Sequence, residues 1–72
     1  MDVFAKRLRE LRKSKRVYQK EIAELLNIVG RQYIRYEAGE VDPPVSKVIT
    51  LANYYNVSVD YLLGLSDNPE RK

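Results

Sequence analysis

The sequence predicts an all-helical domain of five short helices, and three observations support this. Apolar residues recur every three or four positions along most of the chain, as they do in a helix with one buried side. Asparagine, glycine and proline interrupt this pattern where helices typically end. No segment shows the strict alternation of apolar and polar residues that is typical of a half-buried strand. A chain of 72 residues forms one small domain.

The first helix is expected at residues 3–14, with Asp2 as its N-cap. Phe4, Leu8 and Leu11 lie at spacings of four and three and form its inward side. A second face of this segment carries four cations, namely Lys6, Arg9, Lys13 and Arg16. That face serves either solubility or contact with phosphate. We favour solubility, because other helices are better candidates for binding a polyanion.

The second and third helices are expected at residues 19–26 and 30–37. The apolar side of the second consists of Ile22, Leu25 and Leu26. Asn27 ends this helix because asparagine tolerates left-handed backbone geometry, and Gly39 ends the third helix for the same reason. The short connection between the two helices indicates that they form one unit, at residues 18–37.

The fourth and fifth helices are expected at residues 45–55 and 59–63. Prolines precede the fourth helix, and its expected inward stripe is Val45, Val48, Ile49, Ala52 and Tyr55. Ser58 is the expected N-cap of the fifth helix, and Gly64 ends it. We expect residues 1–65 to form the domain and residues 66–72 to form a polar tail or linker.

The composition excludes several classes of function. The chain has no cysteine and no histidine, so it lacks disulfides, thiolate nucleophiles, imidazole bases and the usual zinc ligands. No nucleophile–base pair or glycine-rich phosphate loop is present. We therefore expect no enzyme activity, no cofactor, no metal and no small-molecule substrate. The absence of a membrane-length apolar run and of a signal peptide favours a cytoplasmic protein.

Charge is distributed unevenly along the chain. Residues 1–35 carry ten Lys and Arg against four acids, whereas residues 36–72 carry three against six. Such asymmetry favours a face that binds a polyanion, although basic faces are also common on soluble helices.

The unit at residues 18–37 has the features that a helix-turn-helix needs. Ala23 permits close approach of a neighbouring helix, Ile28 fills the turn and Tyr33 can point inward. The chain resembles the Cro/phage-repressor (XRE-type) helix-turn-helix family over about residues 4–65. The resemblance is carried by residues 7–12 (RLRELR), 19–26 (QKEIAELL), 34–39 (IRYEAG) and 57–64 (VSVDYLLG). It implies a compact, lambda-repressor-like DNA-binding domain of the Cro/CI kind.

This resemblance implies roles for particular residues. The positions that face base edges are Gly30, Arg31, Gln32 and Arg35, and an arginine can donate two hydrogen bonds to guanine. Gln19 falls where the family contacts the DNA backbone, and we assign its neighbours Tyr18 and Lys20 to the same contact. Arg12 and Glu37 occupy positions that form a structural ion pair in the family.

The chain departs from the family pattern at several positions. Tyr18 and Val29 replace the usual Ser or Thr caps, and Glu40 and Asp42 place negative charge near the expected phosphates. Gly30 brings no side chain to a base-facing position, but it lets the backbone come close to DNA or acts as the cap itself. Ile34 is also unusual, and it either packs inward, touches a thymine methyl group or joins a protein contact.

The sequence therefore leaves two functions open. The first is a sequence-specific transcriptional regulator, a repressor that binds a two-fold symmetric operator in double-stranded DNA as a homodimer. Its dimer surface would lie on the C-terminal helices, at Tyr54, Tyr55, Tyr61, Leu63 and Leu65. The alternative is a protein-interaction module of the antitoxin or anti-repressor type, whose DNA reading is weakened. The sequence leaves open whether the tail leads into a further domain.

Overall fold

The structure is a computed structural model that describes residues 2–71. It holds five helices in that range: α1 (Asp2–Lys15), α2 (Gln19–Leu25), α3 (Gly30–Glu37), α4 (Val45–Tyr55) and α5 (Val59–Leu62). No strand occurs among these described residues, so the predicted all-helical class is confirmed. The two ends of the expected domain ranges, Met1 and Lys72, lie outside the described residues.

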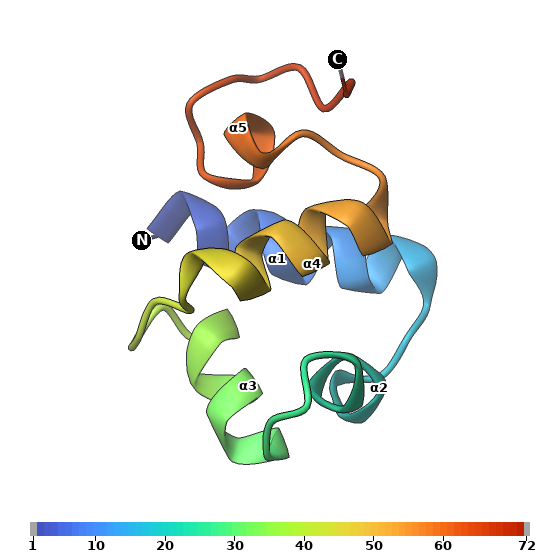
Figure 1. Cartoon of the computed structure of the whole chain (residues 1–72), viewed down its shortest axis with the longest axis vertical. Helices are drawn as coiled ribbons and strands as arrows, with labels where there is room; N and C mark the ends of the chain where they lie inside the picture. Colours follow the sequence, from blue (N-terminus) through green and yellow to red (C-terminus); the bar gives the residue numbers. More distant parts are fainter. Residues whose placement is uncertain (1, 72) are drawn as a thin grey trace.

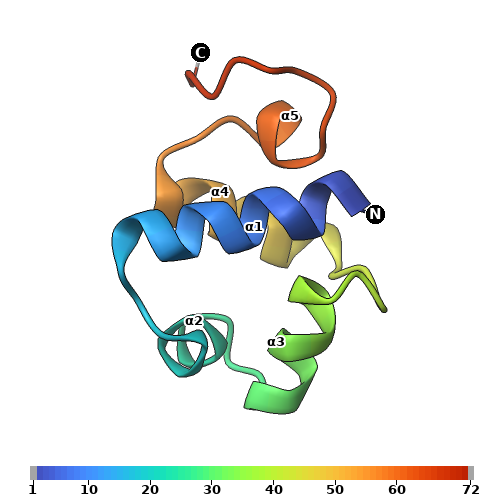
Figure 2. The same ribbon diagram turned by 180° about the vertical axis from the view of Figure 1, so that it is seen from behind.

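The helices occupy three levels along the long axis of the molecule. α2 and α3 lie together at one end, at the bottom of Figures 1 and 2, and they contact each other. α5 lies at the opposite end with the C-terminal segment looping around it (Figure 1). α1 and α4 run between these two levels, and α1 contacts both α3 and α5. The pair α2–α3 is therefore held from one side only, and its other side faces solvent.

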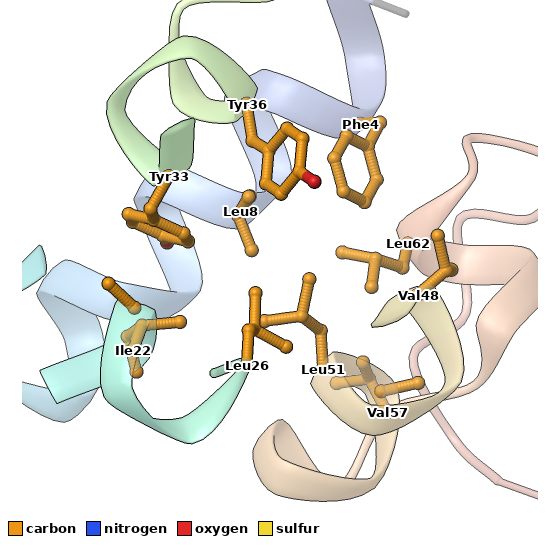
Figure 3. Packing of buried hydrophobic residues seen from close by; sticks show 12 residues of the cluster. Phe4, Leu8, Ile22, Leu26, Tyr33, Tyr36, Val48, Leu51, Val57 and Leu62 are labelled. Carbon is orange, nitrogen blue, oxygen red and sulfur yellow. The ribbon is translucent and has the colours of Figure 1, made fainter. Parts of the chain in front are cut away.

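One hydrophobic core joins all five helices. Figure 3 shows Leu8 of α1, Leu26 after α2 and Leu51 of α4 pointing toward one another at its centre. Phe4, Tyr33 and Tyr36 add aromatic rings, and the rings of the two tyrosines meet edge to face with centroids 6.5 Å apart. Burial of these side chains stabilises five helices that are each too short to be stable alone.

Every helix ends in the same backbone motif. The residue that follows each helix or its C-cap has a positive φ angle: Arg16, Asn27, Gly39, Asn56 and Gly64. In each case two backbone N–H groups fold back to helix carbonyls, as when Ile28 N–H bonds to Ala23 O at 3.0 Å after α2. This is the Schellman motif, which satisfies carbonyl groups that the helix leaves unpaired. The predicted stops at Asn27 and Gly39 are confirmed.

The structure corrects four of the expected helix boundaries, in three helices. α1 extends one residue further at each end, so that Asp2 lies inside the helix and Arg16, in a left-handed conformation, ends it. Leu26 and Leu63 are C-caps rather than helical residues, because the left-handed residues Asn27 and Gly64 follow them directly. The predicted bounds of α3 and α4 are confirmed.

Three expected inward residues are exposed, namely Leu25, Val45 and Ile49. The buried side of α4 is instead formed by Val48, Leu51 and Ala52. These two stripes on α4 overlap and have the same helical spacing, so periodicity alone does not distinguish them. On α2, the side that faces the core is already filled by Ile22, Ala23 and Leu26.

Candidate nucleic-acid interface

The unit formed by α2 and α3 has the geometry of two helices crossing steeply. In Figure 1, α2 is seen nearly end-on while α3 runs in the plane of the view. Ala23 of α2 is buried in the core, and Ile28 is half-buried in the turn between the two helices. The left-handed conformation of Asn27 reverses the chain within a few residues. One face of α3 is left free to meet a partner.

The residues of α3 divide by helical period into an inner and an outer face. The inner face carries Tyr33, Tyr36 and Glu37, all of which are buried. Arg31, Ile34, Arg35 and, at the C-cap, Ala38 are exposed on the other side of the helix, and Gly30 is exposed as its first residue. Gln32 is half-buried at the border of the two faces. The structure therefore places two of the four expected base-reading residues, Arg31 and Arg35, on the outer face, with Gly30 exposed at the start of the helix.

The two arginines of this face differ in their surroundings. Arg31 is exposed and has no ion-pair partner among the described residues. Arg35 Nε lies 3.5 Å from Glu40 Oε2, and both side chains are largely exposed. A carboxylate on Nε leaves the two terminal nitrogens of Arg35 available for a ligand. The acid of the following loop thus partly neutralises one arginine of the pair.

The start of α3 is built without a side-chain cap. Val29 is the N-cap in extended geometry, and its side chain makes no capping hydrogen bond. Gly30 is the first helical residue, so the expectation that it acts as the cap itself is wrong. A Cβ atom added at Gly30 would meet nothing within 4 Å. The first N–H groups of α3 receive no hydrogen bond from a side-chain cap, so they can attract an anion.

The three residues expected at the DNA backbone lie together at the start of α2. Tyr18 is the N-cap of α2, and it and Lys20 are exposed. Gln19 is half-buried, and its Nε2 donates a hydrogen bond to Glu37 Oε1 at 3.1 Å. One amide hydrogen of Gln19 is thus bound inside the protein, and the second is available to an outside acceptor.

Arg12 and Glu37 form an ion pair beneath this surface. Arg12 Nε lies 2.6 Å from Glu37 Oε2, and Arg12 Nη2 lies 3.2 Å from Oε1, which makes the contact bidentate. The Glu37 side chain is only 3% exposed and the Arg12 side chain is 14% exposed. Because Arg12 also donates to Val17 O, the pair joins α1, the segment before α2 and the end of α3.

The protonation of this cluster follows from its contacts. Burial alone would raise the pKa of Glu37, but hydrogen bonds, first of all from Arg12 and also from Gln19, lower it below its ordinary value. The hydrogen bond to Glu37 raises the pKa of Arg12. The pair is therefore fully charged at neutral pH.

Two tyrosine hydroxyls are buried beside the ion pair without a hydrogen bond of good geometry, those of Tyr33 and Tyr55. Burial, and then the neighbouring Glu37 carboxylate, raises the pKa of both phenols. Both therefore remain neutral. They bring α3 and α4 to the same polar cluster that joins α1 to the unit formed by α2 and α3.

A family model described as a helix-turn-helix domain matches residues 5–67. The chain belongs to this helix-turn-helix family. The resemblance to Cro and phage repressors found in the sequence is thereby confirmed.

The relatives of this helix-turn-helix domain are named as transcriptional regulators, a non-enzymatic class of protein. The chain is 43% identical to the uncharacterised regulator YobD of Bacillus subtilis, over 97% of its own length and 62% of that protein. It is 48% identical to the regulator ImmR of Bacillus subtilis, over 85% of its own length and 48% of that protein. The chain thus spans about half to three fifths of these relatives.

A solved structure has the same fold as this domain. It is the crystal structure of a transcriptional regulator from Listeria innocua, with a TM-score of 0.82 and 41% sequence identity. The match covers 85% of this chain and 57% of that one. The two proteins thus share the helical fold over the matched part of this chain.

The helix-turn-helix domain uses several cations in a way that the sequence analysis missed. Each of α2–α5 receives a hydrogen bond from a distant Lys or Arg at a carbonyl of its C-terminal end. Lys47 of α4 donates to Leu26 O after α2 at 2.8 Å, and Arg9 of α1 donates to Glu37 O at the end of α3. Arg7 donates to Tyr61 O of α5, and Arg71 donates to Ala52 O of α4. Positive charge is favourable at a helix C-terminus.

These contacts change the interpretation of the basic face on α1. Arg9 is committed to the end of α3, whereas Lys6, Lys13 and Arg16 are exposed. A run of cations at helical spacing does not show which cation binds a helix end and which faces solvent. Arg9 is distinguished only by the fold, which brings α1 close to the end of α3.

The C-terminal residues expected at a dimer surface are partly used within the domain. Tyr54, Tyr55, Tyr61 and Leu63 are partly buried against the core, and Leu65 is exposed. Lys15 lies over the ring of Tyr54 and Arg7 lies over the ring of Tyr61.

Within residues 2–71, no helix is long and apolar enough to cross a membrane.

Proposed function

We propose that this chain binds double-stranded DNA sequence-specifically and acts as a transcriptional regulator, with α3 lying in the major groove. One observation carries the proposal: Arg31 and Arg35 stand on the exposed face of a helix whose opposite face is fixed to α1 by Arg12 and Glu37. A rigidly held helix can present side chains to base edges at defined positions.

Each part of the surface has a role in this proposal. Arg31 and Arg35 each donate two hydrogen bonds to a guanine, and Gln32 reads an adenine or binds a phosphate at the border of the face. The backbone at Gly30 approaches the DNA closely. Gln19, with its remaining amide hydrogen, binds a phosphate at the start of α2 together with Tyr18 and Lys20.

The proposal extends to a repressor that acts in the cytoplasm as a homodimer on a two-fold symmetric operator. Dimer half-sites would then lie about 34–36 Å apart on one side of the duplex. The contact would use the C-terminal helices, where Leu65 is exposed beside partly buried Tyr61 and Leu63. Sedimentation with and without operator DNA tests it, and a monomer under both conditions would contradict it.

Selection of bound sequences from a random pool of duplex DNA, followed by titration with salt, tests the proposal directly. We expect enrichment of a site with two-fold symmetry. Affinity for that site should fall roughly a hundredfold between 50 and 200 mM salt if about four phosphates are contacted, through release of counterions.

Variants distinguish the recognition of particular bases from general electrostatic attraction to DNA. Arg31→Ala should weaken discrimination at one base pair by about 1–3 kcal/mol. Glu24→Gln is a suitable control, because Glu24 is exposed and has no assigned role in binding. If no sequence is enriched at low salt, and Arg31→Ala and Arg35→Ala have no effect, the DNA-binding function is wrong and the protein-interaction module takes its place.

A further inference from the structure

Ile34 lies within the outer face of α3, between the two arginines along the chain. It follows Arg31 by three residues, which places the two on neighbouring positions of the helix surface. The Ile34 side chain is 50% exposed. The buried positions of this helix belong to Tyr33, Tyr36 and Glu37, so Ile34 does not pack into the core.

The surroundings of Ile34 argue against an apolar protein partner. A partner that covered Ile34 would also cover Arg31, which has no counter-charge among the described residues, and Arg35. Burying arginines without full compensation is costly. A polyanion with one apolar feature suits this surface better, because it pairs with both arginines and still accepts the isoleucine.

The major groove of DNA offers such an apolar feature. Its base edges display hydrogen-bond donors and acceptors, and the C5-methyl group of thymine is the apolar group among them. Because arginine on this face favours guanine, an isoleucine beside it would contact a thymine in the same stretch of sequence.

We propose that Ile34 is a specificity-determining residue that reads the C5-methyl group of a thymine. The inference rests on the proposed function, because it assumes that α3 lies in the major groove. It adds a base contact that the resemblance to the family did not assign. The isoleucine supplies apolar contact, whereas the arginines supply hydrogen bonds and charge.

Replacing thymine by uracil tests the inference, because uracil lacks only the methyl group. Each thymine of the sequence enriched from the random pool is replaced singly by uracil, and dissociation constants are measured for the wild type and for Ile34→Ala. At one position per half-site we expect uracil to weaken wild-type binding about fourfold, the value for one buried methyl-sized group. The same replacement should leave the affinity of Ile34→Ala unchanged.

Ile49→Ala is a matched control, because Ile49 is the same residue type, is 45% exposed and lies on α4, away from the outer face of α3. It should retain the full uracil effect. Ile34→Val is a milder second variant, and thermal melts establish that each variant is folded. Equal uracil effects in the wild type and Ile34→Ala, or no uracil effect at any position, would overturn the role of Ile34 while leaving the proposed function intact. Failure to enrich any sequence would instead overturn both.

Discussion

Glu37 is the residue on which the unit formed by α2 and α3 depends most directly. It accepts hydrogen bonds from Arg12 of α1 and Gln19 of α2 while belonging to α3. Three helices therefore meet at one side chain that is almost fully buried. A charge in such a place is tolerable only while its partners are present.

Removing either Arg12 or Glu37 should lower the free energy of unfolding by more than the intact ion pair contributes to it. Arg12→Met or Glu37→Gln should each lower the free energy of unfolding by about 3 kcal/mol, because each leaves a partner unsatisfied. The double variant should be clearly less destabilised than the sum of the two. Urea denaturation measures all four proteins of this double-mutant cycle. Arg31→Met, at an exposed arginine, should change stability by less than about 0.5 kcal/mol, and additive effects of the first two changes would contradict the coupling.

Acid should weaken the domain through the same residue. The folded state lowers the pKa of Glu37 below its ordinary value, so the unfolded chain takes up this proton first as pH falls. The stabilisation is therefore complete above about pH 4.5 and is lost as pH falls further, through the folded-state pKa. Urea midpoints between pH 7 and pH 2.5 measure this. Glu37→Gln should show a flatter profile, and parallel profiles would exclude Glu37 as the cause.

At this scale the sequence predicted the exposure of the candidate site residues better than the contacts that hold the helices in place. The exposure of Arg31 and Arg35 follows from their place on α3, and the resemblance singled out Arg12 and Glu37. Nothing local distinguishes Arg9 from an exposed cation, because its partner is a carbonyl 28 residues away. Such contacts arise from tertiary placement alone.

At the scale of the element, helix ends were more predictable than helix faces. Four of the five left-handed stops are asparagine or glycine, which the sequence indicates directly. The fifth is Arg16, a residue type that rarely takes this conformation, and α1 therefore extends beyond its expected end. The faces of α4 were less predictable, because two overlapping stripes have equal spacing.

Gly30 offers a test of the proposed contact between α3 and DNA. Gly30→Ala should stabilise the protein by about 0.4–1 kcal/mol, because alanine restricts the unfolded chain and the added methyl group meets open space. The same methyl group should lower affinity for the operator if the backbone approaches DNA here. Thermal melts and binding measurements on one variant give both effects. Unchanged affinity alongside raised stability would show that DNA does not approach Gly30 closely.

At the scale of the whole molecule, residues 66–71 fold back along the domain. Arg7 donates to Ser66 O at 2.7 Å and pairs with Asp67 at 2.9 Å. Ser58 N–H donates to Pro69 O at 2.9 Å, and Arg71 reaches the end of α4. This segment was expected only as a polar tail or linker, because its composition is typical of one.

Deleting residues 66–72 should therefore destabilise the domain. We expect a loss of about 1–2 kcal/mol, since Arg7 and the Ser58 N–H lose partners, and a melting temperature lower by at least about 4 °C. Glu70→Ala, a change within the same segment at an exposed side chain, should have little effect. A truncated protein as stable as the full chain would place the domain boundary at Leu65.

The Lys and Arg side chains that bind the C-terminal ends of α2–α5 affect how the molecule unfolds. A free helix normally frays from its ends, one turn at a time. Here the end of α2 is bound to Lys47 of α4, and the end of α3 is bound to Arg9 of α1. Loosening either end breaks a contact with another element, which couples the helices as they unfold. Amide hydrogens in these last turns should then exchange with solvent as one cooperative group. α3 should remain helical until the whole domain unfolds.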